Sequence, residues 1–193
     1  ENNENGYEQY TDDNNNTYIF KKNKDECVGF LKSDVSDNIV TRSAVENVKT
    51  QEECKNIAID FLMNVIDFEN YTLVNENYTQ DTEIYTFNYS RFIRGYQSSD
   101  FAFVTVDKNG NIKGYAAPNV GIFNNVAVPE ISSNLLDSKI NSELTKAYGS
   151  NLESYDILNR ILIYEEGRLS MVVSLKIEAN DYSLAEEIVV SID

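Results

Sequence analysis

The sequence predicts an α+β fold built from two units in tandem, each with one helix packed on an antiparallel sheet. Two segments carry apolar residues at helical spacing, and each is followed by a series of runs that alternate apolar and polar residues as strands do. Helices and strands are therefore segregated along the chain, which favours α+β over a parallel, doubly wound sheet. The predicted organisation is a disordered tail at 1–17, a first unit at 18–118, a connection at 119–136 and a second unit at 137–193.

The first helix is predicted to begin at Thr50. Thr50 and Glu53 have the spacing of a capping box, in which each side chain accepts a hydrogen bond from the other residue's backbone N–H. One face of the helix is apolar and is predicted to be buried. Its members are Cys54, Ile57, Ala58, Phe61, Leu62 and Val65. The polar segment 67–70 ends the helix.

The strands of the first unit follow this helix in series. They are predicted at 71–78, 83–93, 101–107 and 111–117, and two short peripheral strands are predicted at 18–20 and 28–31. The segment 95–100 is polar and is predicted to be a loop. Asp107-Lys108-Asn109-Gly110 is predicted to turn the chain, with Gly110 at a position that requires a positive φ.

The second helix is predicted to start at Asp137, whose side chain suits an N-cap, and to stop before Gly149, a residue favoured just past a helix end. Its apolar positions are Ile140, Leu144, Ala147 and Tyr148. The predicted strands of this unit are 155–164, 168–178 and 185–192, with turns at 166–167 and 180–181.

Composition bounds the class of protein. The 193 residues carry 32 acidic and 16 basic side chains and a net charge of −16. Phosphate backbones and anionic lipid surfaces repel such a chain, so we expect no nucleic-acid partner. No apolar run approaches the roughly 20 residues that a membrane-spanning helix needs. The chain starts without Met in a polar Asn-rich and acidic segment, so we expect any signal peptide or lipid anchor to lie upstream.

The absence of histidine from the sequence excludes several kinds of chemistry. Ser-His-Asp and Cys-His catalysis, histidine-containing zinc sites and the usual neutral-pH base all need this side chain. A carboxylate-dependent hydrolase is the least favoured of the functions left open. Asp107, Asn109 and Gly110 resemble part of a calcium loop, but the Gly comes two positions early, so a hairpin turn explains them. We therefore expect no enzyme, no cofactor and no metal site.

The two cysteines, Cys27 and Cys54, do not form a CxxC pair. In an exported protein they are compatible with one disulfide. The alternative is two unrelated thiols, with Cys54 simply on the apolar face of the first helix. The sequence leaves both possibilities open.

Six motifs occur in a fixed order over 50–193. In the first unit they are TQEECKNIAIDFL, Phe87-x-x-x-Arg91-x-x-x-Gly95 and Phe103-Val104-Thr105-Val106-Asp107-x-Asn109-Gly110-x-Ile112. In the second they are Arg160-Ile161-Leu162-Ile163, a long strand from Leu169, and Glu187-Ile188-Val189-Val190-Ser191-Ile192-Asp193. This ordered set resembles the PepSY and FTP-like modules found in propeptides of secreted thermolysin-type metalloproteases and in bacterial lipoproteins.

The resemblance implies an exported module that acts by binding or inhibiting rather than by chemistry. We therefore predict a non-enzymatic, extracytoplasmic module that docks a peptide or a protease, at the surface of or outside a low-GC bacterium, a source that the abundance of Asn also fits. The alternative is a structural or tethering domain of a cell-surface lipoprotein. One departure matters, because Ser98-Ser99-Asp100 stands where such modules often carry an apolar or Pro-containing segment.

Arg91, Arg94 and Tyr96 form the candidate partner surface. They gather at the end of the predicted hairpin, and the two arginines are among the few positive charges of an acidic chain. A tyrosine beside them offers a large contact area with a polar tip. We expect a protein or peptide partner there.

Overall fold

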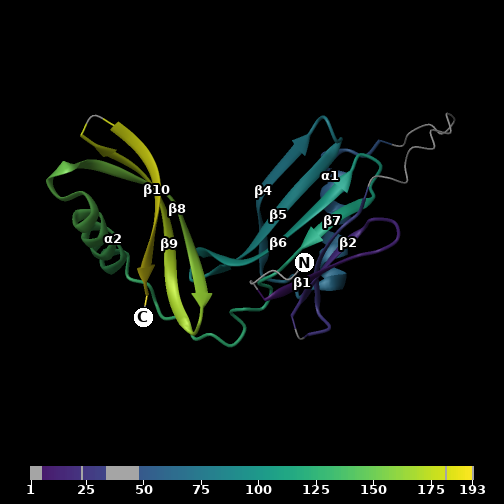
Figure 1. Cartoon of the computed structure of the whole chain (residues 1–193), viewed down its shortest axis with the longest axis horizontal. Coiled ribbons are helices and arrows are strands. Elements are labelled where there is room, and N and C mark those ends of the chain that lie inside the picture. Colours follow the sequence, from purple (N-terminus) through teal and green to yellow (C-terminus); the bar gives the residue numbers. More distant parts are fainter. Residues whose placement is uncertain (1–5, 23, 34–47, 181, 193) are drawn as a thin grey trace. The chain divides into compact units, whose positions relative to one another are not determined.

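The structure is a computed structural model that describes residues 6–22, 24–33, 48–180 and 182–192. The fold is α+β, as the sequence predicts, with two helices and a mostly antiparallel sheet of ten strands in the described residues (Figure 1). In chain order the elements are β1 (Tyr7–Thr11), β2 (Thr17–Lys21), β3 (Cys27–Leu31), α1 (Gln51–Val65), β4 (Tyr71–Thr79), β5 (Ile84–Ile93), β6 (Tyr96–Asp107), β7 (Ile112–Ala116), α2 (Ser133–Tyr148), β8 (Leu152–Glu165), β9 (Arg168–Ala179) and β10 (Tyr182–Ser191).

The strands pair in the order β1-β2-β3-β7-β6-β8-β9-β10, while β5 lies beside β6 with β4 beyond it. The pair β6–β8 is parallel over a short stretch, where Gln97 is opposite Ile161 and Ser98 is opposite Leu162. Contacts divide the chain into two compact units. The first comprises Glu1–Ser90 and Asp100–Val120, and the second comprises Arg91–Ser99 and Gly121–Asp193.

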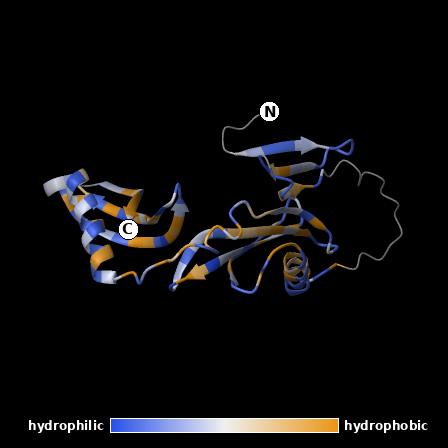
Figure 2. Cartoon of the chain, turned by 90° about the horizontal axis from the view of Figure 1, so that it is seen from below, coloured by the Kyte–Doolittle hydropathy of each residue, from blue (hydrophilic) through white to orange (hydrophobic). Residues whose placement is uncertain are grey.

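In the first unit, α1 packs its apolar face on the strands, and Figure 2 shows this face turned toward the sheet. The capping box is confirmed, because Glu53 N donates to Thr50 Oγ1 (3.2 Å) and Thr50 N donates to Glu53 Oε2 (2.8 Å). The buried core beneath the helix consists of Cys54, Ala58, Leu62, Phe87, Tyr89, Ala102, Val104, Val106, Tyr115 and Ala117.

In the second unit, α2 covers one face of β8, β9 and β10. Every second residue of β9 is buried, as expected for a strand with one face on a core. The core consists of Phe123, Leu136, Ile140, Leu144, Leu162, Leu169, Met171, Val173, Leu175, Ile177, Ala179 and Val190. The helix ends at Gly149, which adopts a positive φ of 57° and donates its N–H to Thr145 O.

The N-terminal segment corrects one prediction. Where the sequence predicts a disordered tail over 1–17, residues Tyr7–Thr11 form β1 and pair antiparallel with β2. The polar residues between the strands make the turn, because Asp12 Oδ1 accepts hydrogen bonds from the N–H groups of Asn14 and Asn16, both at 2.9 Å. Asp and Asn favour such turns because their short side chains form hydrogen bonds with the nearby backbone. The polar segment between β1 and β2 therefore closes a hairpin. Residues 1–5 lie outside the described part of the chain.

Two further boundaries differ from the prediction. Arg94 and Gly95 have φ values of 53° and 82° and form a two-residue turn, so β6 begins at Tyr96 where a loop over 95–100 is predicted. The second helix begins one turn before the predicted Asp137, because Ser132 supplies the N-cap and accepts from Leu135 N at 3.5 Å.

The predicted connection 119–136 lies largely within the second unit. Apolar residues of this segment pack on the core of that unit, and they are Ile122, Phe123, Val126, Val128, Ile131 and Leu136. The hairpin end Arg91–Ser99 belongs to the same unit. A segment without regular structure is therefore tied down by its own apolar side chains.

Candidate functional site

Arg91, Arg94 and Tyr96 stand at the β5–β6 turn and have contacts within the second unit. Arg91 Nη1 donates to Asn124 Oδ1 at 2.6 Å, and Arg94 Nε donates to Val128 O at 3.2 Å. Tyr96 is half-buried and packs against the core of the unit. Both arginines thus hold the segment that runs between β7 and α2. That these residues also contact a partner stays a prediction.

The polar segment Ser98-Ser99-Asp100 contains two fully buried side chains, and both are hydrogen-bonded. Ser98 Oγ donates to Arg91 O at 2.7 Å within the second unit. In the first unit, Tyr71 donates its hydroxyl to Asp100 Oδ1. Burial of a carboxylate or a hydroxyl is tolerated when a partner is supplied. Both side chains therefore have partners inside the fold.

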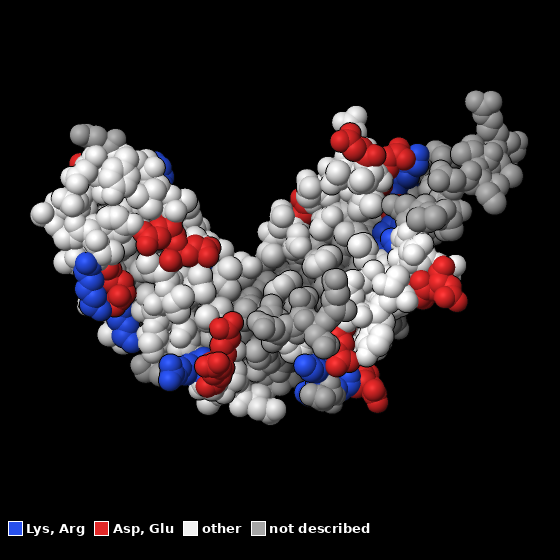
Figure 3. Space-filling model, in the orientation of Figure 1, with Lys and Arg blue, Asp and Glu red and all other residues white. Residues whose placement is uncertain are grey.

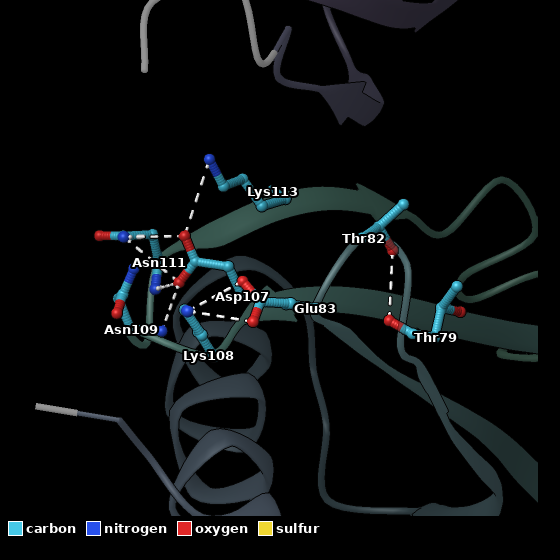
Figure 4. Close-up of polar contacts among 8 residues, drawn as sticks. All are labelled: Thr79, Thr82, Glu83, Asp107, Lys108, Asn109, Asn111 and Lys113. Atoms are coloured by element: carbon cyan, nitrogen blue, oxygen red, sulfur yellow. Dashed lines mark hydrogen bonds and ion pairs between the residues drawn. The ribbon is translucent and has the colours of Figure 1, made fainter. Parts of the chain in front are cut away.

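The turn around Asp107 gathers several polar and charged side chains of the first unit (Figure 4). Asp107 Oδ1 accepts from the backbone N–H groups of Asn109 (2.9 Å) and Asn111 (2.8 Å), and Asp107 Oδ2 accepts from Asn111 Nδ2 (2.9 Å). Lys113 Nζ lies 3.6 Å from Asp107 Oδ2. Burial on its own raises the pKa of the Asp107 carboxyl, but the hydrogen bonds from Asn111 and Asn109 and the nearby Lys113 outweigh it and hold that pKa below its usual value.

The contacts of this cluster are those of a hairpin turn. Both carboxylate oxygens of Asp107 accept N–H groups. Beside it, Lys108 pairs with Glu83 at 2.9 Å, which places a positive charge next to the carboxylates. Within the ranges that the structure describes, no group of three acidic, cysteine or histidine side chains could hold a metal ion.

A surface depression of about 450 Å³ lies against the β1–β2 hairpin. It is lined by Glu8, Tyr10, Phe20, Lys24 and Asp25. Tyr10 and Phe20 meet edge to face with ring centroids 5.6 Å apart, and the Tyr10 hydroxyl donates to Glu8 Oε2 at 2.7 Å. Carboxylates and an ammonium group of opposite charge share this depression, so it does not select a ligand of one charge.

Both cysteines are free, which favours the alternative of two separate thiols. Cys27 is exposed at the start of β3, whereas Cys54 is buried on α1. The Cys54 thiol donates to Asp107 O at 3.6 Å, and burial raises the pKa of that thiol. A buried thiol with a raised pKa is a poor nucleophile.

β10 is an edge strand of the second unit. β10 pairs with β9 on one side over the whole of Tyr182–Ser191 without a bulge. Among the described strands none pairs with it on the other side. Ile192 N donates to Leu169 O at 2.9 Å, which fixes the alternation of the ladder.

From this alternation, the even-numbered residues of β10 direct their backbone groups to β9. The odd-numbered residues therefore direct their N–H and C=O groups away from the sheet, and they are Ser183, Ala185, Glu187, Val189 and Ser191. One of these groups is taken, because Lys139 Nζ donates to Ser191 O at 2.6 Å. The four residues before it leave a row of outward donors and acceptors at the edge. Sequence reasoning located this strand but could not identify it as an edge.

Neither helix of the described residues is long and apolar enough to cross a membrane. No protein-family model and no curated protein sequence matches the chain. Among solved structures, the chain is similar to the C-terminal domain of YpeB from Bacillus megaterium, with a TM-score of 0.45 and 13% identical residues. The similarity covers 97% of this chain and 77% of that chain. None of the residues described above takes a role from this likeness.

Proposed function

We propose that the chain is a non-enzymatic, extracytoplasmic binding module of the PepSY type, which takes an extended peptide of a partner protein onto the free edge of β10. The observation that carries the proposal is the row of outward backbone groups at Ser183, Ala185, Glu187 and Val189. An added strand would pair with these groups, and such main-chain hydrogen bonds give edge docking its affinity.

The character of β10 supports this function. Proteins usually protect an edge strand by making it short, by placing Pro or Lys on it, or by bending it with a bulge. β10 has ten residues, a regular ladder and neither Pro nor Lys. An edge left this open serves pairing with another chain.

A proline substitution tests the edge. Ala185→Pro removes an outward N–H without breaking a hydrogen bond to β9, so the fold should tolerate it while strand docking is blocked. Gln9→Pro is the matched control, because Lys22 N donates to Gly6 O and the register of β1 therefore turns the Gln9 N–H away from β2. The probe is a displayed library of random heptapeptides, from which peptides enriched on the wild-type chain are synthesised.

We expect the enriched peptides to bind the wild type and Gln9→Pro equally, and Ala185→Pro at least tenfold more weakly. In the wild type, bound peptide should slow hydrogen exchange at the amides of 183, 185, 187 and 189, because pairing protects them. A library that yields no enriched peptide, or binding that Ala185→Pro leaves unchanged, contradicts the proposal. The first of these results favours the alternative of a tethering domain.

The extracytoplasmic address is part of the same proposal. It rests on the resemblance to exported modules. Fractionation of the source cells, with sequencing of the native N-terminus, tests it. We expect the protein in the wall, membrane-associated or medium fraction, and a protein found wholly in the cytoplasm overturns this part.

A further inference from the structure

In the second unit, the face of the sheet opposite α2 carries a row of apolar side chains that ends at the free edge of β10. Ile161 on β8 is opposite Val172 on β9, and Val172 is opposite Val189 on β10. Their chain neighbours Leu162, Val173 and Val190 are buried beneath α2, so the row lies on the opposite face. Val189 ends the row with 61% of its side chain exposed. The row therefore stops at a position where an added strand would continue it.

A carboxylate stands two residues before this apolar position and on the same face. Glu187 is exposed, and its Oε1 accepts from Ser174 Oγ at 2.9 Å, which orients the group across the sheet. No lysine or arginine of the described residues forms an ion pair with it. The nearest cation on the ladder, Lys176 opposite Ala185, is paired with Glu178 at 2.8 Å. Glu187 thus keeps its charge available at the edge.

Among the odd-numbered residues of β10, which share one face of the sheet, Glu187 alone carries a charge. On the face shown in Figure 3, the charged side chains of the second unit stand in small separate groups on a largely uncharged surface. A broad negative electrostatic field would attract any cation. A single carboxylate beside an apolar position instead favours one register of an added strand. Directly opposite residues on neighbouring strands have β-carbons about 5 Å apart and contact each other.

Resting on the proposed function, we propose that the β10 edge selects an extended segment with an apolar side chain opposite Val189 and a lysine or arginine opposite Glu187. The two side chains are two residues apart, so both lie on the face of Ile161 and Val172. The segment runs antiparallel to β10, the orientation with the slightly more stable ladder. Its pattern in chain order is then apolar, any residue, basic.

The test uses short synthetic peptides as probes. The matching peptide is acetyl-Thr-Thr-Val-Thr-Lys-Thr-Thr-amide, and its partners replace Lys by Glu or exchange the positions of Val and Lys. Thr fills the other positions because it favours strands and is uncharged. Affinity is measured by fluorescence anisotropy of labelled peptides, and amide exchange at 183–189 is measured at saturating peptide.

Charge exchange between the two chains makes the test specific. On the wild type we expect the Lys peptide to bind about five- to tenfold more tightly than the Glu peptide, since one gains an opposite charge and the other a like charge. Glu187→Lys should reverse this order, and Glu187→Gln should abolish it. Glu153→Lys makes an equal change of charge at an exposed position of β8, and it should still bind the Lys peptide more tightly than the Glu peptide. The preference should shrink in 1 M salt, which screens exposed charges.

The outcomes separate the two proposals. If both peptides protect the amides of 183–189 with equal affinity, the edge docks strands without this selection, and the inference is overturned while the proposed function stands. If the exchanged-order peptide binds best, the inferred antiparallel pattern is wrong. If none of these peptides protects the amides but library-enriched peptides do, the inference is overturned while the proposed function stands, and if neither kind protects them both proposals fail.

Discussion

The two units share one plan, a helix on an antiparallel sheet, but they fill their cores with different side chains. In the first unit, aromatic rings meet each other repeatedly, and the pairs include Phe30–Phe61, Phe61–Tyr115, Phe68–Tyr71, Phe68–Tyr89 and Tyr85–Phe87. In the second unit, Leu, Ile, Val and Met dominate, and the ring pair there is Phe123–Tyr164. The same architecture is thus reached with two kinds of packing.

The difference lies in the polar groups that each core must accommodate. Burial raises the pKa of Tyr89 and of Tyr115 to about 12 in the first unit. The Tyr89 hydroxyl has no hydrogen-bond partner among the described residues, and an unpaired buried hydroxyl is unfavourable. In the second unit the pKa of Tyr148 is also raised to about 12, but first by its hydrogen bond to Glu186 and only then by burial. Aromatic cores bring hydroxyls inside, whereas aliphatic cores leave them at the rim.

The largest effects should come from truncating each core. Phe87→Ala removes a fully buried ring from the first unit and should lower the free energy of unfolding by about 3–5 kcal/mol. Leu144→Ala removes a fully buried side chain of α2 and should cost about 2–5 kcal/mol. Urea denaturation measures the total loss, and hydrogen exchange followed by mass spectrometry locates it. We expect each change to weaken protection first in its own unit, because contacts are densest within the units.

Exposed side chains of the same kind provide the controls. Phe92 is 44% exposed on β5 and Leu135 is 55% exposed on α2, so Phe92→Ala and Leu135→Ala should change the unfolding free energy by less than about 1 kcal/mol. Equal loss of protection in both units after Phe87→Ala would mean that the chain unfolds as one cooperative body. The two cores would then not differ in their free energies of unfolding.

The hairpin turns of the two units also differ, and this difference depends on pH. The β6–β7 turn is held by the Asp107 carboxylate (Figure 4), whereas the β8–β9 turn uses Glu166 and Gly167 at φ values of 52° and 80°. Asp107→Asn should lower the unfolding free energy by about 1–2 kcal/mol at pH 7, because charged acceptors make the stronger hydrogen bonds. Glu166→Gln should change it by less than about 0.5 kcal/mol.

The sign of the pH effect follows from the lowered pKa of Asp107. A carboxyl with a lower pKa in the folded than in the unfolded state stabilises the fold fully above its unfolded value of about 4. That contribution is lost as the pH falls through the folded value. The gap between wild type and Asp107→Asn, measured by urea denaturation at pH 7, 5 and 3, should therefore be widest at neutral pH and shrink at pH 3. A gap that stays constant would assign the loss to packing.

Local signals in the sequence predict much of this fold. Thr50 with Glu53, the glycine after α2 and the Asp107 turn each depend on neighbours within four residues, and the structure confirms all three. The segment before Thr11 fails for a different reason, since Asn-rich composition indicates disorder while pairing with β2 orders it. Pairing between distant segments is a property of the whole chain and leaves little local signal.

The candidate site shows the same limit. Arg91, Arg94 and Tyr96 stand at the β5–β6 turn, and their contact with a partner stays a prediction. Their bonds to Asn124 and Val128 join residues more than 30 positions apart, so no local pattern could show that these cations are engaged. Likewise, the composition of β10 predicts a strand, but only the order of the sheet makes it an edge.

The smallest effects should come from the helix caps, where Thr50 and Glu53 share more hydrogen bonds than Ser132 makes. Thr50→Ala removes the 3.2 Å bond from Glu53 N and the 3.0 Å bond from the Thr50 hydroxyl to Glu53 Oε2, but keeps the 2.8 Å bond from the backbone N–H of residue 50, and we expect a loss of about 1 kcal/mol. Ser132→Ala removes a single 3.5 Å bond, and Leu135 at the third helical position cannot return one, so about 0.5 kcal/mol should be lost.

Thr50→Ser retains the hydroxyl and is the control for the first cap. Urea denaturation measures the loss of unfolding free energy for each variant, and hydrogen exchange shows in which unit the loss occurs. Equal losses at the two caps would show that the bond from the Thr50 hydroxyl to Glu53 Oε2 adds nothing to the first cap. If Ser132→Ala lowers the unfolding free energy more than Thr50→Ala does, α2 depends on its N-cap more than α1 does. That result would indicate that the aliphatic core of the second unit stabilises its helix less than the aromatic core of the first unit stabilises α1.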